Sequence, residues 1–154
     1  MTNHAVLSAS ASHRWLNCPP SVRLTEKLED KVSTYALEGT DAHELCAYLV
    51  ESALGRKARD PTENLTFYNE EMQHCAEEYR NYVVEQIEIA KTYSRDPTVL
   101  VEQRLDFSKW VPEGFGTGDC IIVADGLLQI IDYKHGLGVL VDADHNPQMM
   151  CYAL

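Results

Sequence analysis

Positive charge is what this sequence has least of. Its 154 residues include 13 Lys and Arg against 24 Asp and Glu, which gives a formal net charge of −11. Binding to nucleic-acid phosphates is driven by Lys and Arg, so a protein that holds DNA by its overall charge has the opposite balance. The composition therefore excludes DNA binding by bulk electrostatics. A basic groove has to be local or supplied by another chain.

Cysteine patterns and long apolar runs are also missing. The 5 cysteines, at positions 18, 46, 75, 120 and 151, form no CxxC pair and no metal-site spacing, and their odd number argues against a disulfide framework. No stretch has the pattern of a signal peptide or a membrane-spanning helix. We expect reduced thiols in a cytosolic protein. With 45% hydrophobic residues, residues 1–154 are expected to form a single globular domain.

A predicted β-hairpin dominates what is present. Asp125-Gly126 separates two apolar runs, which is typical of a two-residue type I′ turn because both central positions need a positive φ. If Ala124 faces Leu127, the same register places Asp119 opposite Asp132. Cross-strand partners have Cβ atoms roughly 4.5–5.5 Å apart, and like charges so placed destabilise a sheet unless something neutralises them. A divalent cation is the simplest neutraliser.

Lys134 is expected on the same face as the two aspartates, with Thr117 opposite it, because side chains alternate along a strand. Carboxylates of this kind suit Mg²⁺ or Mn²⁺, and an ammonium beside them can orient water and balance charge on a phosphate. The alternative is a surface hairpin with solvated charges. The apolar residues on both faces of the two strands favour buried strands instead.

Helices and strands are predicted around the hairpin. His43 and Glu102 are candidate additions to the site, although an ordinary packed histidine and a solvated glutamate are also consistent with the pattern.

In the helix that begins near Phe67, helical spacing favours packing for the tyrosines over stacking on bases, and its acidic residues are expected to face solvent. We predict helices over residues 8–18, from Thr40 or Asp41 to Gly55, over 67–93 and from Pro147 onward, and further strands over 98–107 and 139–141.

Taken together, these residues resemble a known family. The order Gly39-x-x-x-His43, Glu102, Gly118-Asp119, Asp132-Tyr-Lys134 and Gln148-x-x-x-Tyr152 resembles the PD-(D/E)XK nuclease superfamily, in its RecB-type exonuclease branch. The stretch from Ser10 to Pro19 is similar to the opening of phage and prophage members. Gly118 stands where the superfamily's name has Pro.

The resemblance implies an α/β (α+β), restriction-endonuclease-like fold: a mixed central β-sheet with an antiparallel hairpin core flanked by helices. It implies that His43, Asp119 and Asp132 bind Mg²⁺ or Mn²⁺, with Glu102 assisting directly or through a water and the backbone carbonyl of Tyr133 as a further ligand. Lys134 would position and help to deprotonate the attacking water. The resemblance also implies that Gln148 and Tyr152 contact the DNA strand or order the site. Thr117, expected opposite Lys134, is a further candidate DNA contact.

The implied activity is a metal-dependent DNA nuclease, most simply an exonuclease of phage or prophage recombination or repair, in the cytoplasm of a bacterial host cell. DNA is the expected partner, with a recombination protein or a second copy of the chain as further candidates, and no membrane. Alternatives are an inactive DNA-binding or recombination scaffold with the same fold, or an enzyme acting on another phosphoester. Because no helix-ending residue follows Tyr152, we expect that the domain is truncated at its C-terminus.

Overall fold

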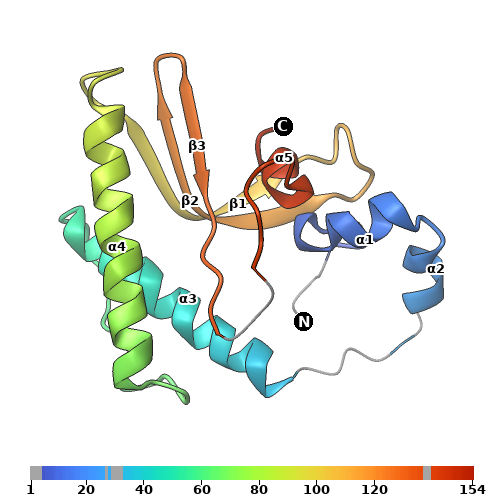
Figure 1. Ribbon diagram of the computed structural model, residues 1–154, viewed down its shortest axis with the longest axis horizontal. Coiled ribbons are helices and arrows are strands. Elements are labelled where there is room, and N and C mark those ends of the chain that lie inside the picture. Colours follow the sequence, from blue (N-terminus) through green and yellow to red (C-terminus); the bar gives the residue numbers. More distant parts are fainter. Residues whose placement is uncertain (1–4, 27, 29–32, 137–139) are drawn as a thin grey trace. The chain divides into compact units, whose positions relative to one another are not determined.

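The structure is a computed structural model that describes residues 5–26, 28, 33–136 and 140–154 (Figure 1). Short helices come first, two long helices follow, and the strands lie in the second half of the chain. In order, the elements are η1 (Ala9–Ala11), α1 (Ser12–Asn17), α2 (Ser21–Thr25), α3 (Thr34–Ala53), α4 (Glu70–Ala90), β1 (Thr98–Asp106), β2 (Phe115–Ala124), β3 (Leu127–Ile131) and α5 (Pro147–Tyr152).

The chain divides into two compact units. The terminal unit consists of Met1–Lys31, Gln103–Gly118 and Val139–Leu154, and the central unit consists of Val32–Glu102 and Asp119–Gly138. The boundary between the units falls within β1 and within β2. Helices α3 and α4 and the hairpin of β2 and β3 belong to the central unit.

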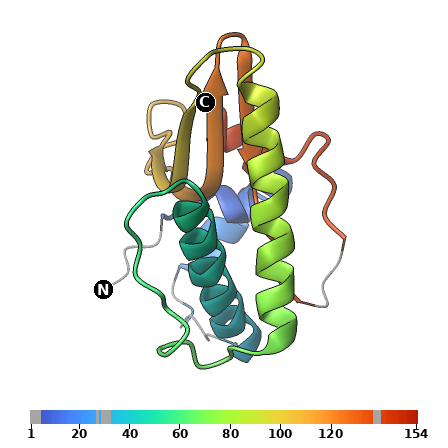
Figure 2. The same ribbon diagram turned by 90° about the vertical axis from the view of Figure 1, so that its left-hand side faces the viewer.

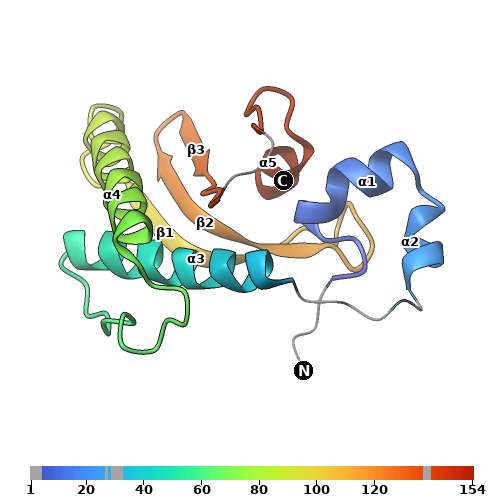
Figure 3. The same ribbon diagram turned by 60° about the horizontal axis from the view of Figure 1, so that its bottom comes forward.

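The predicted fold class is confirmed, since a three-stranded antiparallel sheet with the order β1-β2-β3 is flanked by helices. In the central unit, α3 and α4 lie side by side against the strands (Figures 2 and 3). Burial of apolar side chains, the main driving force of folding, fixes this arrangement. The core between helices and strands contains Val50, Val83, Ile87, Ala90, Val99, Cys120 and Ile122.

Helix α3 begins earlier than the sequence indicated. Its first residue is Thr34, because the Ser33 side chain accepts a hydrogen bond from the Ala36 N–H at 3.2 Å and thereby caps the helix. The predicted start at Thr40 or Asp41 is wrong. Asn69 caps α4 in the same way through the Met72 N–H at 2.8 Å, and the glutamates on the outer side of α4 are mostly exposed, as expected.

The hairpin has the predicted turn and register. Ala124 pairs with Leu127, and the ladder continues to the pair of Cys120 and Ile131, with Gly126 at φ +73°. Strand β3 then ends at Ile131, so the prediction that Asp132 and Lys134 lie within a strand is wrong. The predicted ladder pairs Asp119–Asp132 and Thr117–Lys134 accordingly lie beyond the ladder.

Some apolar side chains of the hairpin are more exposed to solvent than its apolar sequence predicted. Asp119, Cys120, Ile121 and Ile122 are buried, but Val123 near the turn is 42% exposed and Leu128 on β3 is 49% exposed. Strand β3 is at the edge of the sheet, so nothing in the described chain pairs with its outer side. The buried residues of the hairpin therefore lie toward the end that carries Asp119.

The predictions for the terminal unit are confirmed in part. Residues 9–17 form η1 and α1, and α1 ends before Cys18 and the two prolines, as predicted. Pro147 opens α5 behind an Asn146 cap. The short strand predicted over 139–141 is absent at Leu140 and Val141, while Val139 lies outside the described residues. Among the helices described, none combines the length and the apolar character that crossing a bilayer requires.

Two glycines give opposite expectations for stability. Replacing Gly126 with Ala should lower the free energy of unfolding by about 1 kcal/mol, because the turn needs a left-handed backbone that a Cβ disfavours. Gly39→Ala, inside α3 with nothing within 4 Å of the added Cβ, should raise it by about 0.5–1 kcal/mol. Urea unfolding of both variants measures the difference. Equal effects would contradict the turn assignment.

Candidate metal centre

Three segments of the central unit bring His43, Glu102 and Asp119 together. His43 lies on α3 beside the buried Ala42, Leu45 and Cys46, which hold that part of the helix in place, while Glu102 lies on β1 and Asp119 on β2. One potential ligand atom from each of the three side chains lies within 4.8 Å of the other two. The cluster could hold a metal ion.

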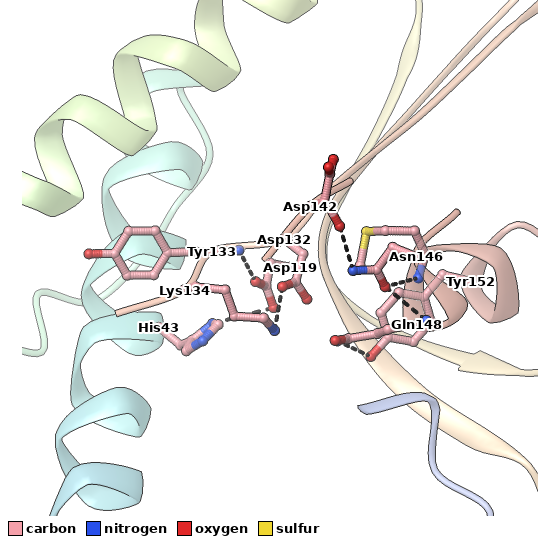
Figure 4. A network of polar contacts seen from close by, with 10 residues as sticks. His43, Asp119, Asp132, Tyr133, Lys134, Asp142, Asn146, Gln148 and Tyr152 are labelled. Atoms are coloured by element: carbon pink, nitrogen blue, oxygen red, sulfur yellow. Dashed lines mark hydrogen bonds and ion pairs between the residues drawn. The ribbon is translucent and has the colours of Figure 1, made fainter. Parts of the chain in front are cut away.

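Two contacts orient the side chain of Asp119. Its side chain is only slightly exposed, and its Oδ1 lies 3.3 Å from His43 Nδ1. Its Oδ2 accepts a hydrogen bond of 2.6 Å from the backbone N–H of Tyr133 (Figure 4). A carboxylate this buried needs such partners, because an unpaired buried charge is costly. The same contact explains why β3 ends at Ile131, since the side chain of Asp119 takes the Tyr133 N–H that a longer ladder would use.

Asp132 and Lys134 form a second part of the site. Lys134 Nζ lies 2.5 Å from Asp132 Oδ2, and their side chains are 51% and 8% exposed, respectively. Burial raises the pKa of Asp132, and the hydrogen bond from Lys134 opposes that shift. Asp132 lies outside the group of His43, Glu102 and Asp119 whose ligand atoms approach most closely. It is nevertheless close enough for the charges of Asp119 and His43 to affect its pKa.

Glu102 has an unfavourable backbone conformation, and its carboxylate lies where its negative charge is unfavourable. Its φ is +48°, inside a strand, which is an uncommon conformation for a residue with a side chain and costs of order 1–3 kcal/mol. The residue is exposed overall, but its carboxylate reaches the cluster. Partial burial of that carboxylate, together with the charge of Asp119, raises the pKa of Glu102 to about 7. Strained backbone of this kind gathers at functional sites.

The charges of the cluster act on His43 as well. Its hydrogen bond with Asp119 raises its pKa against the opposing effect of burial. Both shifts in pKa favour the protonated forms of His43 and Glu102 in the metal-free protein. A divalent cation would replace those protons, because metal ligands have to be deprotonated. One imidazole and two carboxylates are a donor set that divalent ions such as Mn²⁺ accept.

Tyr133 links the cluster to residues that the sequence analysis passed over. Its ring lies edge-on to His43, at 5.7 Å between centroids, and its hydroxyl lies 3.0 Å from His135 Nδ1. His135 Nε2 in turn lies 3.7 Å from Glu38 Oε1. His135 is not among the predicted site residues. Its place two residues after Tyr133, beside the Asp-x-Lys motif, was the available signal.

The remaining predicted DNA-contacting residues belong to the terminal unit. Gln148 and Tyr152 lie one turn apart on α5, with Gln148 Nε2 3.4 Å from the Tyr152 hydroxyl (Figure 4). Tyr152 is buried and packs against Gly116, where a Cβ would lie 2.7 Å from the Tyr152 ring. Thr117 is exposed on β2. Their roles toward DNA stay predictions.

Comparison with known proteins gives one family. A sequence model of the family described as "Protein of unknown function (DUF2800)" matches residues 4–154, so the chain belongs to this family. No solved structure matches the chain.

The raised pKa of Glu102 predicts a pH dependence of stability in the metal-free protein. Between its ordinary value of 4.5 and about 7, the folded chain keeps a proton that the unfolded chain releases. The free energy of unfolding should therefore fall as pH rises through this window. The raised pKa of His43 acts in the same direction. Urea unfolding in a chelator at several pH values should show a shallower fall for Glu102→Gln, and higher stability than wild type above pH 7.

Glu85→Gln is the matched control, because Glu85 is an exposed glutamate on α4 and the substitution removes the same charge. It should leave the slope between pH 4.5 and 7 as in wild type. If the two variants behave alike, net charge rather than the cluster sets the pH dependence.

Proposed function

We propose that this member of the DUF2800 family is a metal-dependent nuclease that hydrolyses phosphodiester bonds in DNA. The observation that carries the proposal is the convergence of His43, Glu102 and Asp119 in one group beside the ion pair of Lys134 and Asp132. A metal held by acids next to a lysine is a common way to cleave a phosphodiester. The order of these residues in the chain, which resembles PD-(D/E)XK nucleases, adds support.

The ligand set proposed for Mg²⁺ or Mn²⁺ starts with the three clustered side chains. Asp119 is already oriented by two contacts, one from His43 and one from the Tyr133 N–H. Asp132 and the Tyr133 carbonyl are the further ligands that the resemblance implies. The ion would lower the pKa of a bound water and polarise the phosphate.

Lys134 has the position for a role in the chemistry. Its ammonium is half exposed and held by Asp132, so a phosphate could approach it from solvent. There it would orient the attacking water and stabilise the negative charge that develops on the phosphoryl oxygens. The expected products carry a 5′-phosphate and a 3′-hydroxyl, as the resemblance implies.

The net charge of −11 weighs against tight binding of DNA by this chain alone. Many of the acids are accounted for, since they lie in the cluster itself or on the exposed side of α4. We propose that a recombination protein or a second copy of the chain supplies further affinity, in the cytoplasm of a bacterial host. Gln148, Tyr152 and Thr117 are the proposed DNA contacts of the terminal unit.

A scaffold that kept the fold without activity is the second candidate, and the acidic charge is the observation that favours it. Loss of catalysis removes the need for the ligands. A scaffold would therefore be expected to have lost a carboxylate or Lys134. The chain retains all of them, together with a strained Glu102 that has no evident value for stability. We therefore rank hydrolysis first.

Replacing Lys134 with Ala should leave Mn²⁺ binding intact and lower the rate of DNA cleavage by about 100-fold or more, because only the transition state is expected to need the ammonium. Cleavage of labelled linear DNA and calorimetric titration of Mn²⁺ measure the two effects. Lys91→Ala is the matched control, since Lys91 is 49% exposed and pairs with Glu88 as Lys134 pairs with Asp132.

Lys91→Ala should cleave as wild type does. Asp119→Asn should lose both Mn²⁺ binding and cleavage, because it removes a ligand charge of the cluster. Full turnover by the Lys134→Ala protein would remove Lys134 from the mechanism. Mn²⁺ binding without cleavage of any DNA by the wild-type chain would favour the scaffold.

A further inference from the structure

A groove runs along α4 beside the candidate metal centre. Its volume is about 430 Å³, within the range of pockets that hold small organic ligands. One wall is formed by α4, and the other by the segment that leaves β3. All of the lining residues belong to the central unit.

The α4 wall presents one helical face. His74, Glu78 and Tyr82 follow one another at four-residue steps, the spacing that places side chains on the same side of a helix, and all three are exposed. Tyr79 lies between them and is partly buried against the core. The face thus combines the partly buried ring of Tyr79 and the exposed ring of Tyr82 with the polar side chains of His74 and Glu78.

The aromatic part of the groove has geometry suited to a flat ligand. Tyr79 and Tyr133 are held edge to face, with 5.2 Å between their centroids and 60° between their planes. Tyr82 is 51% exposed, although a tyrosine at this spacing was expected to pack. Accessible aromatic side chains such as Tyr82 are the surfaces on which proteins stack bases.

The groove and the metal centre share residues. Asp132 and Lys134 line the groove, and they are also the ion pair that adjoins the cluster of His43, Glu102 and Asp119. A ligand in the groove therefore lies beside Lys134, whose ammonium is paired with Asp132. Glu78 carries negative charge on the α4 side, which repels a phosphate there. The phosphate of a nucleotide would accordingly lie at Lys134, and its uncharged ring would lie along α4.

We propose that this groove binds the base of an unpaired nucleotide whose phosphate lies at Lys134 and the metal centre. The proposal rests on the proposed function for the identity of the ligand. A base inside a duplex has both faces covered by its neighbours, so a stacking site of this kind takes a base from a single strand or from a frayed end. The substrate class is therefore DNA with unpaired nucleotides at the scissile position.

Binding of two small ligands in the presence of Mn²⁺ tests the base site without relying on cleavage. Deoxyadenosine 5′-monophosphate carries base, sugar and phosphate, and 2-deoxyribose 5-phosphate lacks only the base. Calorimetry should find the nucleotide bound about tenfold more tightly, the order that one stacked base contributes. Tyr82→Ala should abolish this preference and leave the affinity for the sugar phosphate unchanged, whereas Tyr82→Phe should retain it.

Tyr93→Ala is the matched control, because Tyr93 is 52% exposed near the end of α4 and does not line the groove. It should bind both ligands as wild type does. Equal affinities for the two ligands, or an unchanged preference in Tyr82→Ala, would overturn the base site. So would a dimer that Tyr82→Ala dissociates, since the face would then belong to a second copy.

The two proposals fail in different ways. A preference for the nucleotide in a protein that cleaves no DNA would overturn the nuclease and support the base site. Cleavage that is lost in Lys134→Ala but identical on single-stranded and duplex DNA, without a preference for the nucleotide, would support the nuclease and overturn the base site.

Discussion

The carboxylate of Asp119 is the contact on which the central unit's site depends. One oxygen meets His43 on α3 and the other accepts the backbone N–H of Tyr133 after β3, so a single side chain on β2 ties a helix, a strand and the end of the hairpin together. Because Asp119 is buried, these partners are also what makes its charge tolerable there. The placement of Tyr133, and through it of Asp132 and Lys134 on either side, follows from this contact.

The cluster is arranged at the expense of the stability of the metal-free protein. Glu102 adopts a left-handed backbone within a strand, and its carboxylate resists ionisation because it is partly buried and lies near the charge of Asp119. Such a concentration of negative charge is stable only with protons or a cation as counter-charge. A fold selected for stability alone would place an apolar residue or a glycine at this position. The combination of strain and charge is therefore the physical argument for a bound ion, independent of any resemblance to nucleases.

The sequence predicted the parts of the structure that depend on local rules. Asp125-Gly126 determined the turn and, through the alternation of strands, the register of the hairpin. The strand limits were missed because Asp119 uses its side chain to bind the Tyr133 N–H, a tertiary contact that no local pattern contains. The positive φ of Glu102 had no local signal either, because such a backbone is uncommon for any residue other than glycine. His43 and Glu102 were candidates, but tertiary structure is what brings them to Asp119: α3 packs against the sheet and carries His43 there, and the pairing of β1 with β2 carries Glu102 there.

Locating the ion is the most direct test of the central claim, that His43, Glu102 and Asp119 hold a divalent metal. An anomalous difference map from crystals of the protein grown with Mn²⁺ gives its position. We expect a peak bonded to His43 and to the carboxylates of Glu102 and Asp119, the three side chains whose ligand atoms already lie within 4.8 Å of one another. A map without a peak there at saturating Mn²⁺, or with Mn²⁺ bound only elsewhere, would contradict the claim and leave the cluster without a counter-ion.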